Sequence, residues 1–182
     1  MVVIDRIEHF VEIPEGVDAK LDDNGDVTIS GENSSQTRNF SHSKVQLLEQ
    51  GNGLLVRIDL PRRKDKALAG TWNAHLNNMV KGVTEGFTYR LKAVYSHFPM
   101  NLKADAEAAE LVVNNYFGEK VPRRAAYVGD VIVKVENKTE VVVTGHDKEQ
   151  VGQTAANIER CCSVKKRDRR VFQDGIYLVA KK

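Results

Sequence analysis

Short apolar stretches, either alternating or rich in β-branched residues, run through the first sixty residues and are separated by Gly, Asn and Asp. Such stretches are typical of β-strands, because alternate side chains of a strand point to opposite faces of a sheet. The pattern predicts strands over residues 9–13, 27–30, 45–49 and 54–60.

The apolar spacing then changes to that of a helix. Apolar side chains recur at Leu68, Trp72, Leu76, Met79 and Val83. This stripe predicts a helix with one buried face, whose continuation Gly82 and Gly86 weaken. Residues 88–98 predict a long strand that leads into the second half.

The second half begins with an ambiguous segment, residues 101–117, in which good helix formers precede strand-forming LVVNNYF. Residues 131–135 and 140–144 predict a hairpin. Asp147 can cap a helix whose apolar residues recur at steps of four, three and four. The apolar residues of the helix after Asp147 are Val151, Ala155, Ile158 and Cys162. A strand over residues 176–180 then closes the second half.

The two helical segments align at a constant offset of 82 residues. Asp65 and Lys66 match Asp147 and Lys148, and three further positions agree: Gly70 with Gly152, Ala74 with Ala156, and Leu76 with Ile158. We interpret this as an internal duplication, which favours a hairpin over residues 101–117. The predicted fold class is α+β, with domains at 1–96 and 97–182, each an antiparallel or mixed β-sheet packed against one main α-helix.

Composition and charge locate a binding function at the carboxyl end. The 182 residues are 41% hydrophobic, which is typical of a folded globular protein, and 27 basic against 25 acidic side chains give a net charge of +2. Residues 1–33 carry −7, residues 34–159 carry +3 and residues 160–182 carry +6. This gradient predicts a polyanionic partner for the last segment.

Several function classes find no support in the sequence. No apolar run approaches the roughly 20 residues of a membrane span, and Asp5 and Glu8 interrupt any signal peptide, so we expect a cytosolic protein. Cys161 and Cys162 are adjacent, which excludes an ordinary disulfide and predicts reduced thiols. Enzyme motifs and metal-ligand spacings are absent, so we expect neither catalysis nor a cofactor or metal. A hydrolase would require Asp59 or Asp65 to converge with His75.

The strongest candidate site is the carboxyl-terminal basic segment. SVKKRDRRVF places five cations in six residues between a predicted helix and a predicted strand, and fixed cations of this kind suit phosphate binding. A solvated loop is the alternative interpretation, and RRKDK from Arg62 is open to the same two readings. The candidate RNA-binding residues are Gln153, Asn157 and Arg160 on the helix and Lys165, Lys166, Arg167, Arg169 and Arg170 after it. Gly152 lies inside a helix, where glycine is less favourable than alanine, so we expect another group to approach its backbone closely. That group is either a packing neighbour, at both duplicated positions Gly70 and Gly152, or RNA, in the second half alone.

Two segments carry a resemblance to a known family. GTWNAHLNNMVKGVTEGFTYRLKAVYSHFP from Gly70 and RVFQDGIYLVAKK from Arg170 resemble the large-subunit ribosomal protein L6 family in its archaeal form, and the resemblance covers essentially the whole chain. It implies two related α+β domains, of which the second is the main ribosomal RNA binder.

The resemblance also implies that the protein is not an enzyme and that it is located on the ribosome. Family members lie on the large subunit near the stalk base and the sarcin-ricin loop region, beside neighbouring ribosomal proteins. Carried over by position, the RNA-facing segments are residues 148–160, which adds Lys148, and residues 165–170. Cys161, Cys162 and Ser163 depart from the residues expected there. An adaptor that binds an acidic protein through the same loop is the alternative function.

Overall fold

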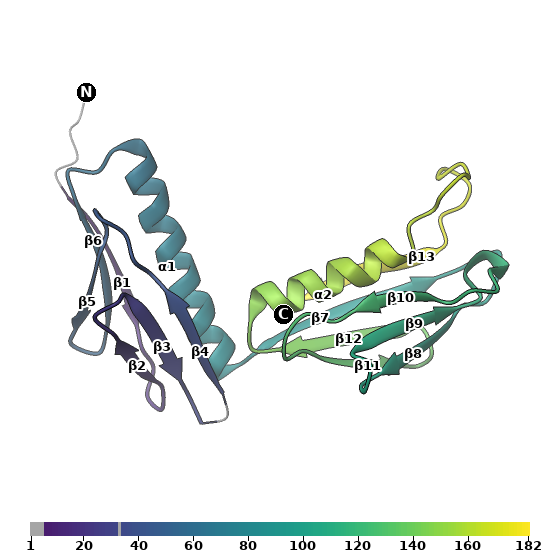
Figure 1. Ribbon diagram of the computed structural model, residues 1–182, viewed down its shortest axis with the longest axis horizontal. Helices are drawn as coiled ribbons and strands as arrows, with labels where there is room; N and C mark the ends of the chain where they lie inside the picture. The colour runs from purple at the N-terminus through teal and green to yellow at the C-terminus, as the bar shows by residue number, and fades with distance from the viewer. Residues whose placement is uncertain (1–5, 33) are drawn as a thin grey trace. The chain divides into compact units, whose positions relative to one another are not determined.

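The chain divides between Glu85 and Gly86 into two units, each with one long helix against two antiparallel sheets (Figure 1). The structure is a computed structural model that describes residues 6–32 and 34–182. The α+β class predicted from the sequence is confirmed.

The first unit contains two three-stranded sheets and the helix α1. One sheet has the order β1-β6-β5, and the other has the order β2-β3-β4. The elements are β1 (Arg6–Glu12), β2 (Asp18–Leu21), β3 (Asp26–Ser30), β4 (Ser35–Asn39), β5 (Gln46–Gln50), β6 (Gly53–Asp59) and α1 (Arg63–Thr84). All four predicted strands are present, whereas β2 and β4 were missed because DAKL is only four residues long and SQTRN is entirely polar.

The predicted stripe of α1 forms much of the first core. Trp72, Leu76 and Met79 are buried, and the Trp72 ring meets Phe40 edge-on with centroids 5.4 Å apart. Strand β3 contributes Val27 and Ile29, whose alternation gives it one fully buried face.

The second unit repeats this arrangement with one more strand. One sheet has the order β11-β12-β7-β13 and the other the order β10-β9-β8. The elements are β7 (Phe87–Val94), β8 (Asn101–Asp105), β9 (Glu110–Asn114), the 3-10 turn η1 (Tyr116–Gly118), β10 (Arg123–Ala126), β11 (Ile132–Glu136), β12 (Glu140–Gly145), α2 (Lys148–Cys161) and β13 (Gly175–Lys181). The hairpin β8–β9 confirms the reading that duplication favoured, and β10 was missed.

The sheet orders show where the repeat begins. Strand β6 lies between β5 and β1, as β12 lies between β11 and β7, so β1 and β7 are counterparts and each opens its unit. In the first unit, α1 is therefore not followed by a closing strand of its own unit, because the next strand, β7, belongs to the second. Strand β7 pairs with β12 and β13, which is why the division falls at residue 85 and not at 96.

Strand β13 has no counterpart among the described residues of the first unit. It pairs with β7 along its length, and the last residue continues the pairing, since Lys182 and Thr88 exchange backbone hydrogen bonds of 2.9 and 3.0 Å. The second sheet thus depends on both ends of its unit.

The two helices match in packing but not in their starts. At the offset of 82, Ala69, Trp72 and Leu76 of α1 correspond to Val151, Thr154 and Ile158 of α2, and all six are buried. Asp147 caps α2, where its carboxylate accepts from the Glu149 amide at 2.8 Å. Asp65 lies inside the first turn of α1 and accepts from the Arg62 amide at 3.1 Å, because α1 begins three residues earlier relative to the repeat.

Candidate nucleic-acid interface

The outer face of α2 presents polar side chains because its opposite face is buried by apolar residues. Gln153 and Arg160 are exposed, as the sequence predicted. Asn157 is occupied within the protein, since its Nδ2 donates to the Ala126 carbonyl at 3.1 Å and its Oδ1 accepts from Gln153 at 2.9 Å. Asn157 therefore joins α2 to β10, and its amide is only partly available to a ligand.

Lys148 lies at the far end of the helix from the other candidates. With a rise of 1.5 Å per residue, it stands on the order of 18 Å along the axis from Arg160. Its ammonium is 5.9 Å from the centre of the Phe87 ring. The structure thus does not bring Lys148 together with the carboxyl-terminal cations.

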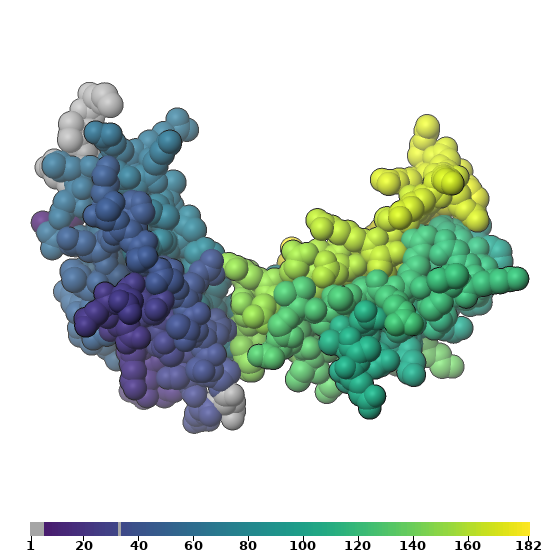
Figure 2. All heavy atoms as spheres, in the orientation of Figure 1, coloured from purple at the N-terminus to yellow at the C-terminus, as the bar shows by residue number. Residues whose placement is uncertain are grey.

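The segment that we name the basic loop, residues 162–174, connects α2 to β13. All five predicted cations on it are exposed, and the loop stands at the protein surface beyond the end of α2 (Figures 1 and 2). Within the described chain, none of Lys165, Lys166 and Arg169 forms an ion pair. Arg170 lies 3.5 Å from Asp168, and both side chains are more than half exposed, so this pair neutralises little of the loop's charge.

Aromatic rings hold the base of the loop. The Arg167 guanidinium lies 4.9 and 5.0 Å from the ring centres of Phe117 and Phe172. The Phe172 ring in turn stacks on His97, with centroids 4.8 Å apart and an interplanar angle of 27°. On the side of β13, the Tyr177 hydroxyl donates to the Gln173 carbonyl of the loop at 2.7 Å.

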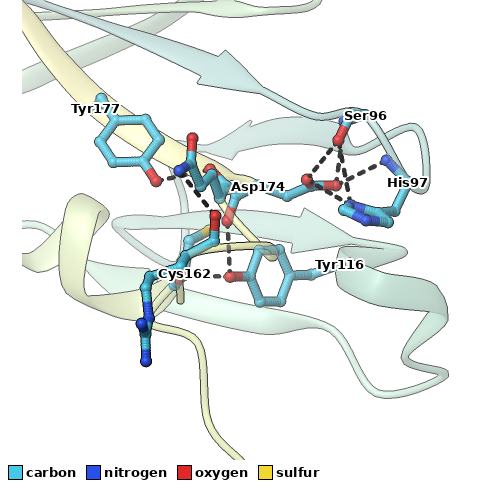
Figure 3. A network of polar contacts seen from close by, with 8 residues as sticks. Ser96, His97, Tyr116, Cys162, Asp174 and Tyr177 are labelled. Atoms are coloured by element: carbon cyan, nitrogen blue, oxygen red, sulfur yellow. Dashed lines mark hydrogen bonds and ion pairs between the residues drawn. The ribbon is translucent and has the colours of Figure 1, made fainter. Parts of the chain in front are cut away.

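A buried carboxylate fixes the end of the loop where β13 begins (Figure 3). Asp174 is 3% exposed and accepts from the backbone amides of Ser96 and His97 at 3.2 and 3.1 Å. The Ser96 hydroxyl and His97 Nδ1 lie 3.1 and 2.8 Å from its other oxygen. Burial raises the pKa of Asp174, but these hydrogen bonds, above all those from His97, outweigh burial and leave the pKa below its usual range.

One hydroxyl ties both ends of the loop. The Tyr116 hydroxyl hydrogen-bonds the carbonyl oxygens of Cys162 and, at 3.0 Å, Asp174 (Figure 3). Burial raises the pKa of Tyr116 to about 12, so the hydroxyl keeps its proton and remains a donor at neutral pH. Sequence reasoning missed this residue, because a Tyr in a strand-like run gives no sign of a role so far along the chain.

A second residue missed from the sequence secures the start of the loop. The Arg123 Nη1 donates to the carbonyls of Cys161 and Ser163 at 2.9 and 2.8 Å, while Nε and Nη2 donate to Glu119 at 2.8 and 2.7 Å. The hydrogen bonds from Arg123 are the main reason that the pKa of Glu119 lies below its usual range. A cation at the carboxyl end of α2 also offsets the negative end of the helix dipole.

The remaining residues singled out from the sequence are the two helix glycines and the two aspartates of the first unit. A Cβ on Gly152 would lie 3.9 Å from the Tyr89 ring, and one on Gly70 would meet nothing within 4 Å, so no packing contact requires either glycine. Asp59 pairs with Arg6 at 2.8 Å, and Asp65 lies 3.6 Å from Lys44. Among the described residues, no three His, Cys, Asp or Glu side chains gather as metal ligands would, and no helix is long and apolar enough to cross a membrane.

Comparison with known proteins agrees with this picture. The family model for ribosomal protein L6 matches residues 13–86 and 98–175. The chain is 45% identical over 181 residues to the large ribosomal subunit protein uL6 of Methanobrevibacter smithii, an alignment that covers 100% of this chain and 99% of the relative. The uL6 protein of Haloarcula marismortui is 40% identical over 176 residues, with 97% and 96% covered.

Proposed function

Because the chain belongs to the ribosomal protein L6 family, in its archaeal type, we propose that its second unit binds large-subunit ribosomal RNA through the outer face of α2 and the basic loop. The chain is a structural constituent of the large ribosomal subunit and not an enzyme. Its place near the stalk base and the sarcin-ricin loop region, beside neighbouring ribosomal proteins, is part of the same proposal.

The anchored basic loop carries this proposal. A flexible run of cations would lose much conformational freedom on binding, whereas this loop is tied at both ends by Tyr116 and at its base by Arg167 and Asp174. Fixed cations that neutralise phosphates release counterions from RNA, which makes the affinity strongly dependent on salt. Contacts of this kind position the protein on the RNA backbone and read few bases.

The salt dependence of binding tests the proposal. We compare the full chain with a variant in which Lys165, Lys166 and Arg169 are changed to Gln, which leaves the stacked Arg167 in place. Each lost phosphate contact lowers the slope of log affinity against log salt by about 0.7 to 0.9. The measurement is fluorescence anisotropy with a transcript of large-subunit ribosomal RNA.

A matched control separates position from charge. Arg90, Lys92 and Lys134 are exposed on the sheet face opposite α2, because the alternate residues of β7 and β11 are buried. Changing these three to Gln removes the same charge and is expected to leave the slope nearly unchanged. Equal slopes for both triple variants contradict the proposal. If the loop variant loses binding to an acidic protein and not to RNA, the adaptor function holds instead.

A further inference from the structure

We propose that the depression between β10 and the end of α2 is a second binding site for an RNA backbone phosphate, formed by Arg160 and Lys165 with Arg124 at its rim. This inference rests on the proposed RNA binding and extends it to a strand that sequence reasoning did not implicate. The depression is lined by Arg123, Arg124, Arg160, Cys161, Ser163 and Lys165.

Charge distinguishes this depression from an ordinary surface hollow. Four of its six lining residues are cations and none is an acid. Among the described residues, neither Arg160 nor Lys165 forms an ion pair, although Lys165 lies near enough to Glu119 to help lower the pKa of that carboxyl. Arg160 also ends the outer face of α2 and Lys165 begins the cationic part of the basic loop, so the depression is continuous with the surface proposed above.

Arg123 has a different role from its neighbours in the depression. Four of its five N–H groups are already used, by the Glu119 carboxylate and by the carbonyls of Cys161 and Ser163. Its guanidinium also lies over the Tyr116 ring, 4.2 Å from the centre. Arg123 is therefore a positioning residue, which satisfies the last carbonyl of α2 and that of Ser163 in the loop, and holds the backbone that presents Lys165.

Arg124 forms only an exposed ion pair and remains available to a ligand. Its Nη1 lies 3.4 Å from the Glu110 carboxylate, and its side chain is 62% exposed. An exposed pair of this length contributes little to stability, and a phosphate contact readily offsets its loss. Glu110 thus competes with RNA for Arg124, and removal of the Glu110 charge should favour RNA.

The first test uses charge variants of the full chain with the ribosomal RNA transcript. Arg124→Gln combined with Arg160→Gln is expected to lower the salt slope by about 1.4 to 1.8, at 0.7 to 0.9 per contact. Glu110→Gln is expected to tighten binding, and to do so more than Glu136→Gln, which removes an exposed carboxylate from a different strand. Circular dichroism confirms that each variant is folded.

A second test needs no substitution, because Cys161 lines the depression and the other cysteine, Cys162, is buried. The alkylation rate of Cys161 by iodoacetamide, followed by mass spectrometry of the full chain, should fall several-fold when saturating RNA is present. An unchanged rate together with an unchanged slope in the double variant overturns the site. If the loop variant still shows its lower slope, this inference and the assignment of Arg160 fail while binding by the basic loop stands, and if that slope is also unchanged the proposed function fails with it.

Discussion

The two units share one fold and differ at the point where the helix ends. In the first unit only Glu85 and Gly86 separate α1 from the next strand, whereas in the second the 13 residues of the basic loop separate α2 from β13. The first unit contains ten basic and thirteen acidic side chains, net −3, and the second contains seventeen and twelve, net +5. In our proposal, a duplicated scaffold therefore acquires its RNA-binding surface from a segment that follows the second helix, while the helix packing of the two units stays alike.

The largest expected effect, a loss of folding, comes from cutting the chain on the wrong side of β7. A fragment of residues 97–182 lacks β7, the strand between β12 and β13, and we expect it not to fold. A fragment of residues 86–182 should fold and retain most of the RNA affinity, and residues 1–85 should fold and bind weakly. Circular dichroism with thermal unfolding, followed by anisotropy at fixed salt, measures this.

Either of two outcomes would break the comparison. Cooperative unfolding of fragment 97–182 would mean that β7 is not essential to the second unit. Equal RNA affinity of a folded fragment 1–85 would mean that the first unit carries a primary site of its own.

The second prediction concerns the carboxylate that anchors the loop. Asp174→Asn should destabilise the second unit by about 2 to 3 kcal/mol, because hydrogen bonds to a charged acceptor are lost in a buried place. Since folding lowers the pKa of Asp174, its charge contributes stability above the unfolded pKa of about 4, and this contribution is lost as pH falls through the lower folded pKa. The wild type should therefore lose stability in acid more steeply than the variant in urea unfolding.

Asp168→Asn is the matched control, because Asp168 is an exposed acid of the same loop. It should change stability by less than about 0.5 kcal/mol. Equal acid sensitivity of the wild type and Asp174→Asn would show that the buried carboxylate does not set the pH response.

A smaller effect is expected at the hydroxyl that ties the loop ends. Tyr116→Phe leaves two buried carbonyls without their donor and should destabilise by about 1 to 2 kcal/mol. Hydrogen exchange should quicken across residues 162–174 while the amides of α1 stay protected. Unchanged exchange in the loop would mean that Arg167 and Asp174 hold it without Tyr116.

The paired glycines sharpen the comparison further. Gly70→Ala and Gly152→Ala should each stabilise their helix by roughly 1 kcal/mol, because both sites have room for a methyl group. Only Gly152→Ala should weaken RNA binding, since only α2 faces RNA in our proposal. Thermal unfolding and anisotropy of the two variants provide the test, and intact binding by Gly152→Ala would remove any close approach there.

The smallest effect is predicted for the cations at the start of α1. Changing Arg63, Lys64 and Lys66 to Gln should leave the RNA salt slope within error of the wild type, because nothing ties these side chains into a loop like that of the second unit. A slope lowered by about 2 would make RRKDK a phosphate contact equal to the basic loop.

Sequence patterns predicted the elements that bury apolar residues and missed those that do not. The stripe through Trp72 and Leu76 and the cap at Asp147 were readable because their causes are local. Strands β2, β4 and β10 are polar or short, so pairing with a neighbour and not periodicity defines them. The sequence placed β7 in the first half, whereas in the structure it pairs with β12 and β13, because adjacency in sequence does not reveal a partner about fifty residues away.

The candidate site divides in the same way. The five loop cations were visible as a charge run, but their support by Tyr116 and Arg123 was not, because those contacts join residues about 40 to 60 positions apart. Asn157 was predicted as a ligand contact because of its position on the polar face of the helix, whereas in the structure its side-chain amide donates to the Ala126 carbonyl.

The pairing of Lys182 with Thr88 has a consequence for biosynthesis. A ribosome adds about 5 to 20 residues per second, so the 97 residues after Glu85 take roughly 5 to 20 s to appear. The first unit can fold during that interval, while one edge of β7 stays unpaired until β13 has been synthesised. A nascent chain that stops before β13 therefore carries all five cations of the basic loop, but the strand that holds the end of that loop is not yet paired with β7.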